Sequence, residues 1–253
     1  MTLPVPQISR VEAASTVGET FTPQVATGGV APTDIASAAA LLLADARLPA
    51  GDHAHSGGIE AAVNDGRVRD LADLTAFLDG RLWTVGLTEA ALAAAAAAAG
   101  PDWRRLDLEC TARIVSPALR MTSRALGRQL LRVAHRIWPE RDWEALGSHP
   151  DGPHRVVVLG ACAAAAGLAP RTVALVAAYG SVAVPATAAL RLLGLDPYAV
   201  SATLAALSHD IEQVAEQAAA TPNDLSQLPA AAAVLVEQTA DHHRDAEGRL
   251  FAS

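Results

Sequence analysis

The residues whose types could support chemistry lie together in one short segment. Asp52, His53 and His55 form an Asp-His-x-His cluster that is followed at once by Ser56. Imidazoles and a carboxylate can bind divalent transition metals, so His53 and His55 are weak candidates for metal ligands. Two histidines at i and i+2 converge on one ion only in particular backbone geometries. We therefore favour a structural interpretation, in which His55 and Ser56 cap or brace the next helix, over partner contact or metal binding.

Nucleophilic and lysine-dependent catalysis find little support in the sequence. Ser56 stands outside any G-x-S-x-G frame and follows no predicted strand. All 19 basic residues are arginines, which excludes a Schiff-base lysine and the lysine of a Walker-type phosphate loop. We expect no enzyme activity and no cofactor. A small helical metal-dependent hydrolase that uses Asp52, His53 and His55 stays open as the alternative.

A second group of residues recurs at a fixed spacing. Arginines stand four residues apart at positions 120, 124, 128, 132 and 136. Each step of four turns about 40° around a helix, so the five arginines form a stripe on one side of it. Acidic neighbours such as Asp107, Glu109 or Glu144 are available to neutralise some of them. The two interpretations are a solvated helix face and a contact surface for an acidic partner. Gly127 beside the stripe would let another helix approach closely.

Composition predicts an all-α protein. Hydrophobic residues make up 51% of the 253-residue chain, aromatic residues only 4%, and alanine is the commonest residue. Alanine loses no side-chain entropy in a helix, so this composition favours helix over strand. The net charge of −8 argues against binding to nucleic acid, which needs surplus basic residues. No secretory signal is visible in the first 30 residues, so we expect a cytoplasmic protein.

Helix signals divide the chain into about nine or ten helices in a single-domain bundle. Residues 1–32 mix Pro, Gly, Thr and Ser without periodicity and predict a disordered or loosely docked arm. The uncharged stretch 172–190 is long enough to span a bilayer, but it is diluted with small residues and predicts a central buried helix. Cys110 and Cys162 lie far apart in apolar contexts, which predicts two buried reduced thiols. The predicted helices cover residues 33–46, 58–63, 71–99, 103–114, 117–137, 154–167, 170–193, 196–220 and 228–243.

Five segments carry a resemblance to one protein family. Residues 44–60 read ADARLPAGDHAHSGGIE, an LPxG turn followed by an HSxGLE-like segment, and 61–82 continue with a short helix, a turn and a long helix. Residues 120–134 place an Arg, a Ser and a Gly ahead of a leucine pair. Residues 153–175 resemble the central helix pair of the family. Residues 243–253 begin with a His that stands six residues before an Arg-Leu-Phe sequence. In this order the segments resemble the UreF family of urease accessory proteins.

The resemblance implies a function and a set of partners. It implies an all-helical homodimer without catalytic activity, acting as a scaffold while nickel is loaded into urease. The expected partners are a second accessory protein of the UreD/UreH type, the nickel-carrying GTPase UreG and apo-urease. A helical adaptor unrelated to urease is a further alternative. The resemblance assigns a helical domain to residues 33–244 and a partner-docking tail to residues 245–253.

The expected partner-binding residues come from the resembling segments. Leu250 and Phe251 form an apolar pair near the end of a polar segment, and such a pair usually needs a surface that buries it. The full set is Pro49, Gly51, His55, Ser56, Gly58, Glu60, Arg120, Ser123, Arg124, Gly127, Arg128, His243, Arg249, Leu250 and Phe251.

The sequence also departs from the family pattern at three places. His53 stands where the family usually has an aromatic residue, and Ala118 stands where it usually has a Glu. Leu195 and Asp196 replace a Gly-Gln pair after the long hydrophobic helix. These changes leave the predicted fold intact and bear on the affinity for partners.

Overall fold

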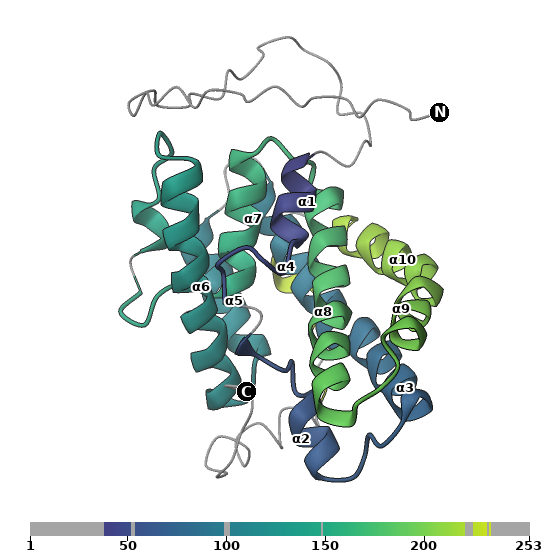
Figure 1. Ribbon diagram of the computed structural model, residues 1–253. Coiled ribbons are helices and arrows are strands. Elements are labelled where there is room, and N and C mark those ends of the chain that lie inside the picture. Colours follow the sequence, from purple (N-terminus) through teal and green to yellow (C-terminus); the bar gives the residue numbers. More distant parts are fainter. Residues whose placement is uncertain are drawn as a thin grey trace, which may run out of the picture. The chain divides into compact units, whose positions relative to one another are not determined.

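The described part of the chain is helical throughout. The computed structural model describes residues 38–51, 54–98, 102–147, 149–220, 225–231 and 233. Among these residues there are α-helices and short helical turns and no β-strand, which confirms the all-α prediction (Figure 1). The expected N-terminal arm, residues 1–32, and the expected docking tail, residues 245–253, lie outside the described residues.

Ten α-helical segments make up the described fold. α3 and α4 are joined through a π-helical turn, Leu82–Gly86, so that they run on as one long helix. Short 3₁₀ turns lie at Glu144–Leu146 and Leu225–Gln227. The α-helical segments are α1 (Ala38–Ala44), α2 (Ile59–Asn64), α3 (Leu71–Arg81), α4 (Leu87–Ala97), α5 (Trp103–Arg113), α6 (Pro117–Ile137), α7 (Arg155–Ala165), α8 (Pro170–Leu193), α9 (Pro197–Ala206) and α10 (Ser208–Ala219).

Local side-chain chemistry explains where several helices begin. The Asp70 carboxylate accepts a hydrogen bond from the Asp73 amide at 2.9 Å and caps α3. The Ser116 hydroxyl accepts from the Leu119 amide at 3.2 Å and caps α6. Such caps satisfy backbone N–H groups that have no partner inside the helix. Prolines occupy the first position of α6, α8 and α9, where their missing N–H group costs nothing.

Small side chains bring the central helices close together. α4 packs against α7, α8 and α10, and α8 packs against α10 as well (Figure 1). A Cβ at Gly160 of α7 would overlap the backbone of Ala93 and the side chain of Ala96 in α4. Alanine and glycine therefore fill this core by letting backbones approach one another. Cys110 and Cys162 are both buried and unpaired, as the sequence predicts.

Helix α8 is the one described helix that is long and apolar enough to cross a membrane. Its apolar window is 61% buried inside the protein, against α4 and α10 among others. Pro185 lies within α8 and is itself buried. The predicted central buried helix is therefore present, with the predicted bounds of residues 170–193.

Two expected helices differ from the structure. The helix predicted for residues 196–220 is divided at Leu207, whose ψ of −2° departs from the helical value of about −42°. This change of direction gives α10 its own packing against α4 and α8. The helix predicted for residues 228–243 is absent at residues 228–231. There the carbonyl groups of Leu228 and Pro229 accept hydrogen bonds from Arg113 instead of from a helix. Most of the remaining predicted helix lies outside the described residues.

Candidate functional site

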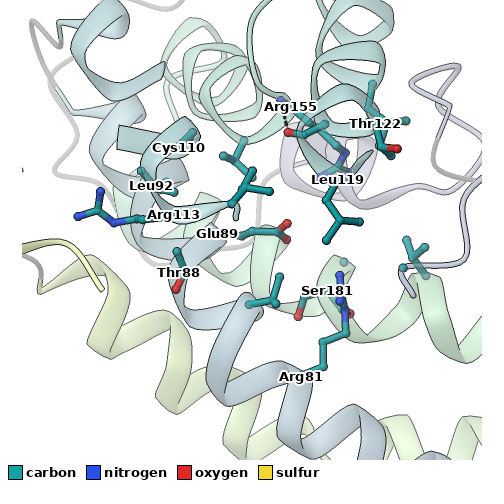
Figure 2. A pocket seen from close by; sticks show the side chains of 18 of the residues that line it. Arg81, Thr88, Glu89, Leu92, Cys110, Arg113, Leu119, Thr122, Arg155 and Ser181 are labelled. Atoms are coloured by element: carbon teal, nitrogen blue, oxygen red, sulfur yellow. Dashed lines mark hydrogen bonds between the residues drawn. The ribbon is translucent and has the colours of Figure 1, made fainter. Parts of the chain in front are cut away.

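A cavity of about 160 Å³ collects the segments that carry the family resemblance (Figure 2). His55 and Gly57 reach it from the loop before α2, Ser123 from α6, and Arg155 and Val156 from the start of α7. These segments are far apart in the sequence, so only the fold brings them together. Its apolar wall includes Val85, Leu92, Ile114, Leu119, Leu126, Val156 and Val184.

Arg81 and Glu89 bring opposite charges to this cavity from one long helix. Figure 2 shows both side chains extending toward the space between α4, α6 and α8. Arg81 donates a hydrogen bond from Nε to the Ser181 carbonyl oxygen of α8 at 2.8 Å. Burial lowers the pKa of the Arg81 guanidinium, and the Glu89 carboxylate opposes that shift. The two groups interact through space without forming an ion pair with each other.

The π turn between α3 and α4 sets the direction of these side chains. In a regular α-helix, residues 81, 85 and 89 would drift by about 40° at each step of four. A π turn closes i→i+5 bonds and is wider, so each residue advances by less and the drift is reduced. Arg81, Val85 and Glu89 accordingly line the same cavity. Gly86 in this turn lies against Ser181, whose Oγ would be only 2.6 Å from an added Cβ.

A buried polar network lies beside the cavity and joins α5, α6 and the start of α7. Arg124 of α6 forms an ion pair with Asp107 of α5, with Nη2 2.9 Å from Oδ2. Arg124 also donates to the Thr111 hydroxyl at 2.9 Å. The backbone amide of His154 donates to Asp107 Oδ1 at 2.8 Å. The His154 ring contacts the hydroxyl groups of Ser123 and Thr111, each at 3.0 Å.

His154 is held in its neutral form. Its side chain is fully buried, and burial followed by the Arg124 guanidinium lowers its pKa to about 4. Asp107 acts in the opposite direction but does not cancel these effects. A neutral imidazole has one donor and one acceptor nitrogen, which matches two hydroxyl neighbours. His154 therefore links Ser123, at the cavity wall, to the charged pair behind it.

The arginine stripe is divided between the interior and the surface. Arg124 is buried and pairs with Asp107, the acidic neighbour that the sequence suggested. Arg120 donates to the carbonyl oxygens of Ile114 and Val115, and Arg128 donates to that of Asp151. Arg132 and Arg136 are exposed. The solvated-face interpretation fits Arg128, Arg132 and Arg136, which are exposed, and is wrong for the buried Arg124.

Gly127 makes a close backbone approach possible. A Cβ at this position would overlap the carbonyl oxygen of Pro153, the residue before His154. The sequence predicted a close approach here by another helix, and the structure places the loop that leads into α7 at this point. Gly127 thereby keeps His154 within reach of α5 and α6.

Described residues between Pro49 and Gly58 shape the chain before α2 and brace the start of that helix. Gly51, Gly57 and Gly58 have φ values of 92°, 61° and 87°, which favour glycine. Ser56 is fully buried, and its Oγ accepts from the Gly58 amide at 3.3 Å, so it braces the start of α2 as predicted. His55 lines the cavity, Glu60 is buried in the first turn of α2, and Pro49 is exposed.

The described residues contain no cluster of side chains that could bind a metal ion. No group of three or more His, Cys, Asp and Glu side chains in that part of the chain is placed to hold an ion. Asp52 and His53 lie outside the described residues. Cys110 borders the cavity, but burial raises the pKa of its thiol well above the ordinary value. Burial likewise raises the pKa of Cys162 to about 12, so both thiols are protonated at neutral pH.

Sequence reasoning missed two residues that hold the C-terminal segment at the cavity. Arg113 donates from Nε to the Pro229 carbonyl oxygen at 2.8 Å and from Nη2 to the Leu228 carbonyl oxygen at 3.1 Å. Thr88 donates to the Ala231 carbonyl oxygen at 3.0 Å. These contacts join residues more than 100 positions apart, and no local pattern signals them. The expected tail residues His243, Arg249, Leu250 and Phe251 lie outside the described residues.

Comparison with known proteins agrees with the resemblance to the UreF family. The sequence profile described as UreF matches residues 68–208. The urease accessory protein UreF of Mycolicibacterium vanbaalenii is 46% identical over 219 residues, covering 84% of this chain and 97% of the relative. The proteins of the same name from Mycobacterium marinum and Mycobacterium tuberculosis are 44% and 46% identical, covering 84% and 68% of this chain and 97% and 81% of the relatives. The chain belongs to the UreF family of urease accessory proteins.

Two of the three departures from the UreF pattern have a structural account. Asp196 caps α9, because its carboxylate accepts from the Tyr198 amide at 3.1 Å. Ala118 is buried in the first turn of α6, where a glutamate side chain would have to reach solvent. Leu195 packs against the core beside Asp196. His53 lies outside the described residues. Ala118, Leu195 and Asp196 are therefore compatible with the helical fold of this UreF protein.

Proposed function

We propose that this protein is a non-enzymatic scaffold of urease maturation. It brings together an accessory protein of the UreD/UreH type and the nickel-carrying GTPase UreG, and the assembly delivers nickel to apo-urease in the cytoplasm. Membership of the UreF family supports a role in urease maturation. That this chain brings the UreD/UreH-type protein and the GTPase together is proposed beyond family membership.

One observation carries the scaffold proposal above the others. The sequence segments typical of the family converge on one cavity whose wall is largely apolar. The polar groups behind it, Asp107, Arg124 and His154, are bound to one another and join α5, α6 and the start of α7. Concave pockets with apolar walls and a few polar groups are suited to binding. The buried thiols and the neutral His154 offer no activated nucleophile or metal site.

The exposed arginines of α6 are the proposed contact for an acidic partner. Arg132 and Arg136 lie on the surface, and no ion pair within the described residues neutralises them. Charges of one sign on a surface steer an oppositely charged partner and fix its orientation. We assign this surface to the GTPase and the tail at residues 245–253 to the UreD/UreH-type protein.

Co-purification tests the scaffold and its arginine contact together. The tagged chain is expressed with the accessory protein, the GTPase and apo-urease, and urease activity is measured beside the bound proteins. Arg132→Glu with Arg136→Glu should reduce GTPase recovery while the circular dichroism spectrum stays unchanged. Arg104→Glu with Arg105→Glu, which reverses two exposed charges on α5, is the matched control. Full urease activation without this chain would refute the scaffold role.

The proposed assembly also includes a homodimer of this chain. Helices rich in small residues can pack closely across an interface, as α4 and α7 do within the subunit. The 26.0 kDa chain should therefore give about twice that mass by light scattering at micromolar concentration. A mass near that of one chain would show that the scaffold acts as a monomer.

A further inference from the structure

The guanidinium of Arg113 on α5 is bound through all of its donors. Nε donates to the Pro229 carbonyl oxygen at 2.8 Å, and Nη2 donates to the carbonyl oxygens of Leu225 and Leu228 at 3.4 and 3.1 Å. Nη1 donates to the backbone and side-chain oxygens of Glu109, one turn earlier in α5. A guanidinium has five N–H groups, and these five hydrogen bonds use every one of them. Arg113 therefore holds residues 225–229 against α5.

Residues 225–231, here called the strap, reach the wall of the cavity. Ala231 lines the cavity, and its carbonyl oxygen accepts from the Thr88 hydroxyl of α4 at 3.0 Å. The Leu228 side chain is buried in the core. Four carbonyl oxygens of the strap are thus bound by two side chains, those of Arg113 and Thr88, which line the cavity themselves.

Attachment of this kind opens more easily than helix packing. The central helices bury apolar side chains along their whole length, whereas the strap is attached largely through Leu228 and through bonds from two side chains to its carbonyl groups. Short segments with few buried apolar groups open at a lower free energy than the whole fold. We propose that the strap, held closed by Arg113, opens separately from the rest of the protein and controls access to the side of the cavity formed by α4 and α5. This inference concerns one chain and does not rest on the scaffold role.

The two cysteines report separately on the strap and on the core. Figure 2 shows Cys110 on the same side of the cavity as Thr88 and Arg113. Cys110 is fully buried, and burial raises the pKa of its thiol well above the ordinary value. Cys162 is equally buried but lies within α7 and not in the cavity wall. A thiol in either position reacts only when the structure around it opens.

Thiol labelling of the full-length protein tests the proposal. N-ethylmaleimide is added at several low urea concentrations, and the modification of each cysteine is followed by mass spectrometry of its peptide. Cys110 should react about 10-fold faster than Cys162 or more, at a rate that hardly changes with urea, because local opening exposes little surface. The rate at Cys162 should rise steeply with urea, because its exposure requires global unfolding. Equal rates with equal urea dependence would overturn the proposal.

Two substitutions assign the opening to the strap. Arg113→Met keeps the length of the side chain and removes its donors, and Thr88→Val keeps the shape and removes the hydroxyl. Both should speed the labelling of Cys110 and leave that of Cys162 unchanged, and Thr88→Val carries the test if Arg113→Met does not fold. Arg105→Met, which replaces an exposed arginine of α5, is the matched control and should change neither rate.

Hydrogen exchange of the strap itself completes the test. The Leu228 amide donates to the Leu225 carbonyl oxygen at 3.3 Å, so it should be protected while the strap is closed. The peptide that contains residues 225–231 should lose protection in Arg113→Met and Thr88→Val, whereas peptides from α7 should keep theirs. Unchanged labelling of Cys110 in both variants, a parallel rise at Cys162, or faster labelling of Cys110 with the strap still protected would each overturn the proposal.

Discussion

Arg124 of α6 and Asp107 of α5 form a buried ion pair, with the guanidinium Nη2 2.9 Å from the carboxylate Oδ2. The pair lies at the junction of three helices, because Asp107 also accepts from the backbone amide of His154 at the start of α7. Arg124 additionally donates to the Gly152 carbonyl oxygen. Each partner of the pair is thus bound to a second element. Removing the Arg124–Asp107 pair should therefore disturb the packing of α5, α6 and the start of α7, and not only the contact between the two side chains.

Breaking this pair is expected to destabilise the protein strongly. Arg124→Ala leaves the Asp107 carboxylate buried without its counter-charge, which typically costs about 3–5 kcal/mol. Arg132→Ala removes an exposed arginine from the same helix and should change the free energy of unfolding by less than about 0.5 kcal/mol. Urea unfolding at pH 7 measures both. Equal effects of the two substitutions would contradict the buried pair.

The glycine at position 127 should be intolerant of a single added methyl group. Gly127→Ala would overlap the Pro153 carbonyl oxygen, and overpacking of this kind costs typically about 1–3 kcal/mol. Gly80→Ala is the matched control, because Gly80 lies in α3 and an added Cβ would meet no atom within 4 Å beyond the adjacent backbone of its own helix. Alanine there should stabilise the helix by roughly 0.5–1 kcal/mol. Thermal unfolding of the two variants should therefore shift in opposite directions.

His154 should make stability depend on pH in the mildly acid range. Its pKa is about 4 in the folded protein, against an ordinary value of 6.5. The unfolded chain therefore binds a proton between these values that the folded chain does not, and stability falls as the pH is lowered from 6.5 to 4. The loss is about 3 kcal/mol, and the stability is fully present above pH 6.5.

Replacing the imidazole isolates this contribution. His154→Gln removes the titrating group, so its free energy of unfolding should vary less between pH 6.5 and 4 than that of the parent protein. Asp45 and Asp73 also have lowered pKa values, because Arg47 and Arg69 bind them, but they are present in both proteins. The difference between the two pH profiles therefore reports His154. Parallel profiles would show that its protonation is the same in the folded and unfolded states.

Local signals were sufficient to predict much of the fold. The helices predicted to begin at residues 71, 117 and 170 begin there in the structure, where a capping Asp70 or Ser116 precedes the helix or a proline stands at its first position. Such signals act within one helical turn, so they can be read without knowing the tertiary structure. The break at Leu207 and the non-helical residues 228–231 depend on packing and on the distant Arg113. Sequence periodicity carries no information about those contacts.

The site was predicted less completely than the fold. The family resemblance predicted His55, Ser123, Arg124 and Gly127 as partner-binding residues, and that role stays a prediction. The spacing of the arginines could not separate the buried Arg124 from the exposed Arg132. That distinction depends on Asp107 being brought alongside by α5. Arg81 and Glu89 carried no visible signal, because their common direction follows from a π turn. Such a turn has no simple sequence signature.

The tail at residues 245–253 should be required for assembly and dispensable for folding. Leu250 and Phe251 can each contribute roughly 1.5–3 kcal/mol when a partner buries them, and Arg249 can add a charge-assisted hydrogen bond. These energies suffice to decide an association of micromolar affinity. Deletion of residues 245–253 should leave the melting temperature nearly unchanged and abolish both binding to the UreD/UreH-type partner and urease activation in cells. Deletion of residues 252–253 alone, which keeps Leu250 and Phe251, should preserve both, and full activation by the longer deletion would show that the tail is not a docking element.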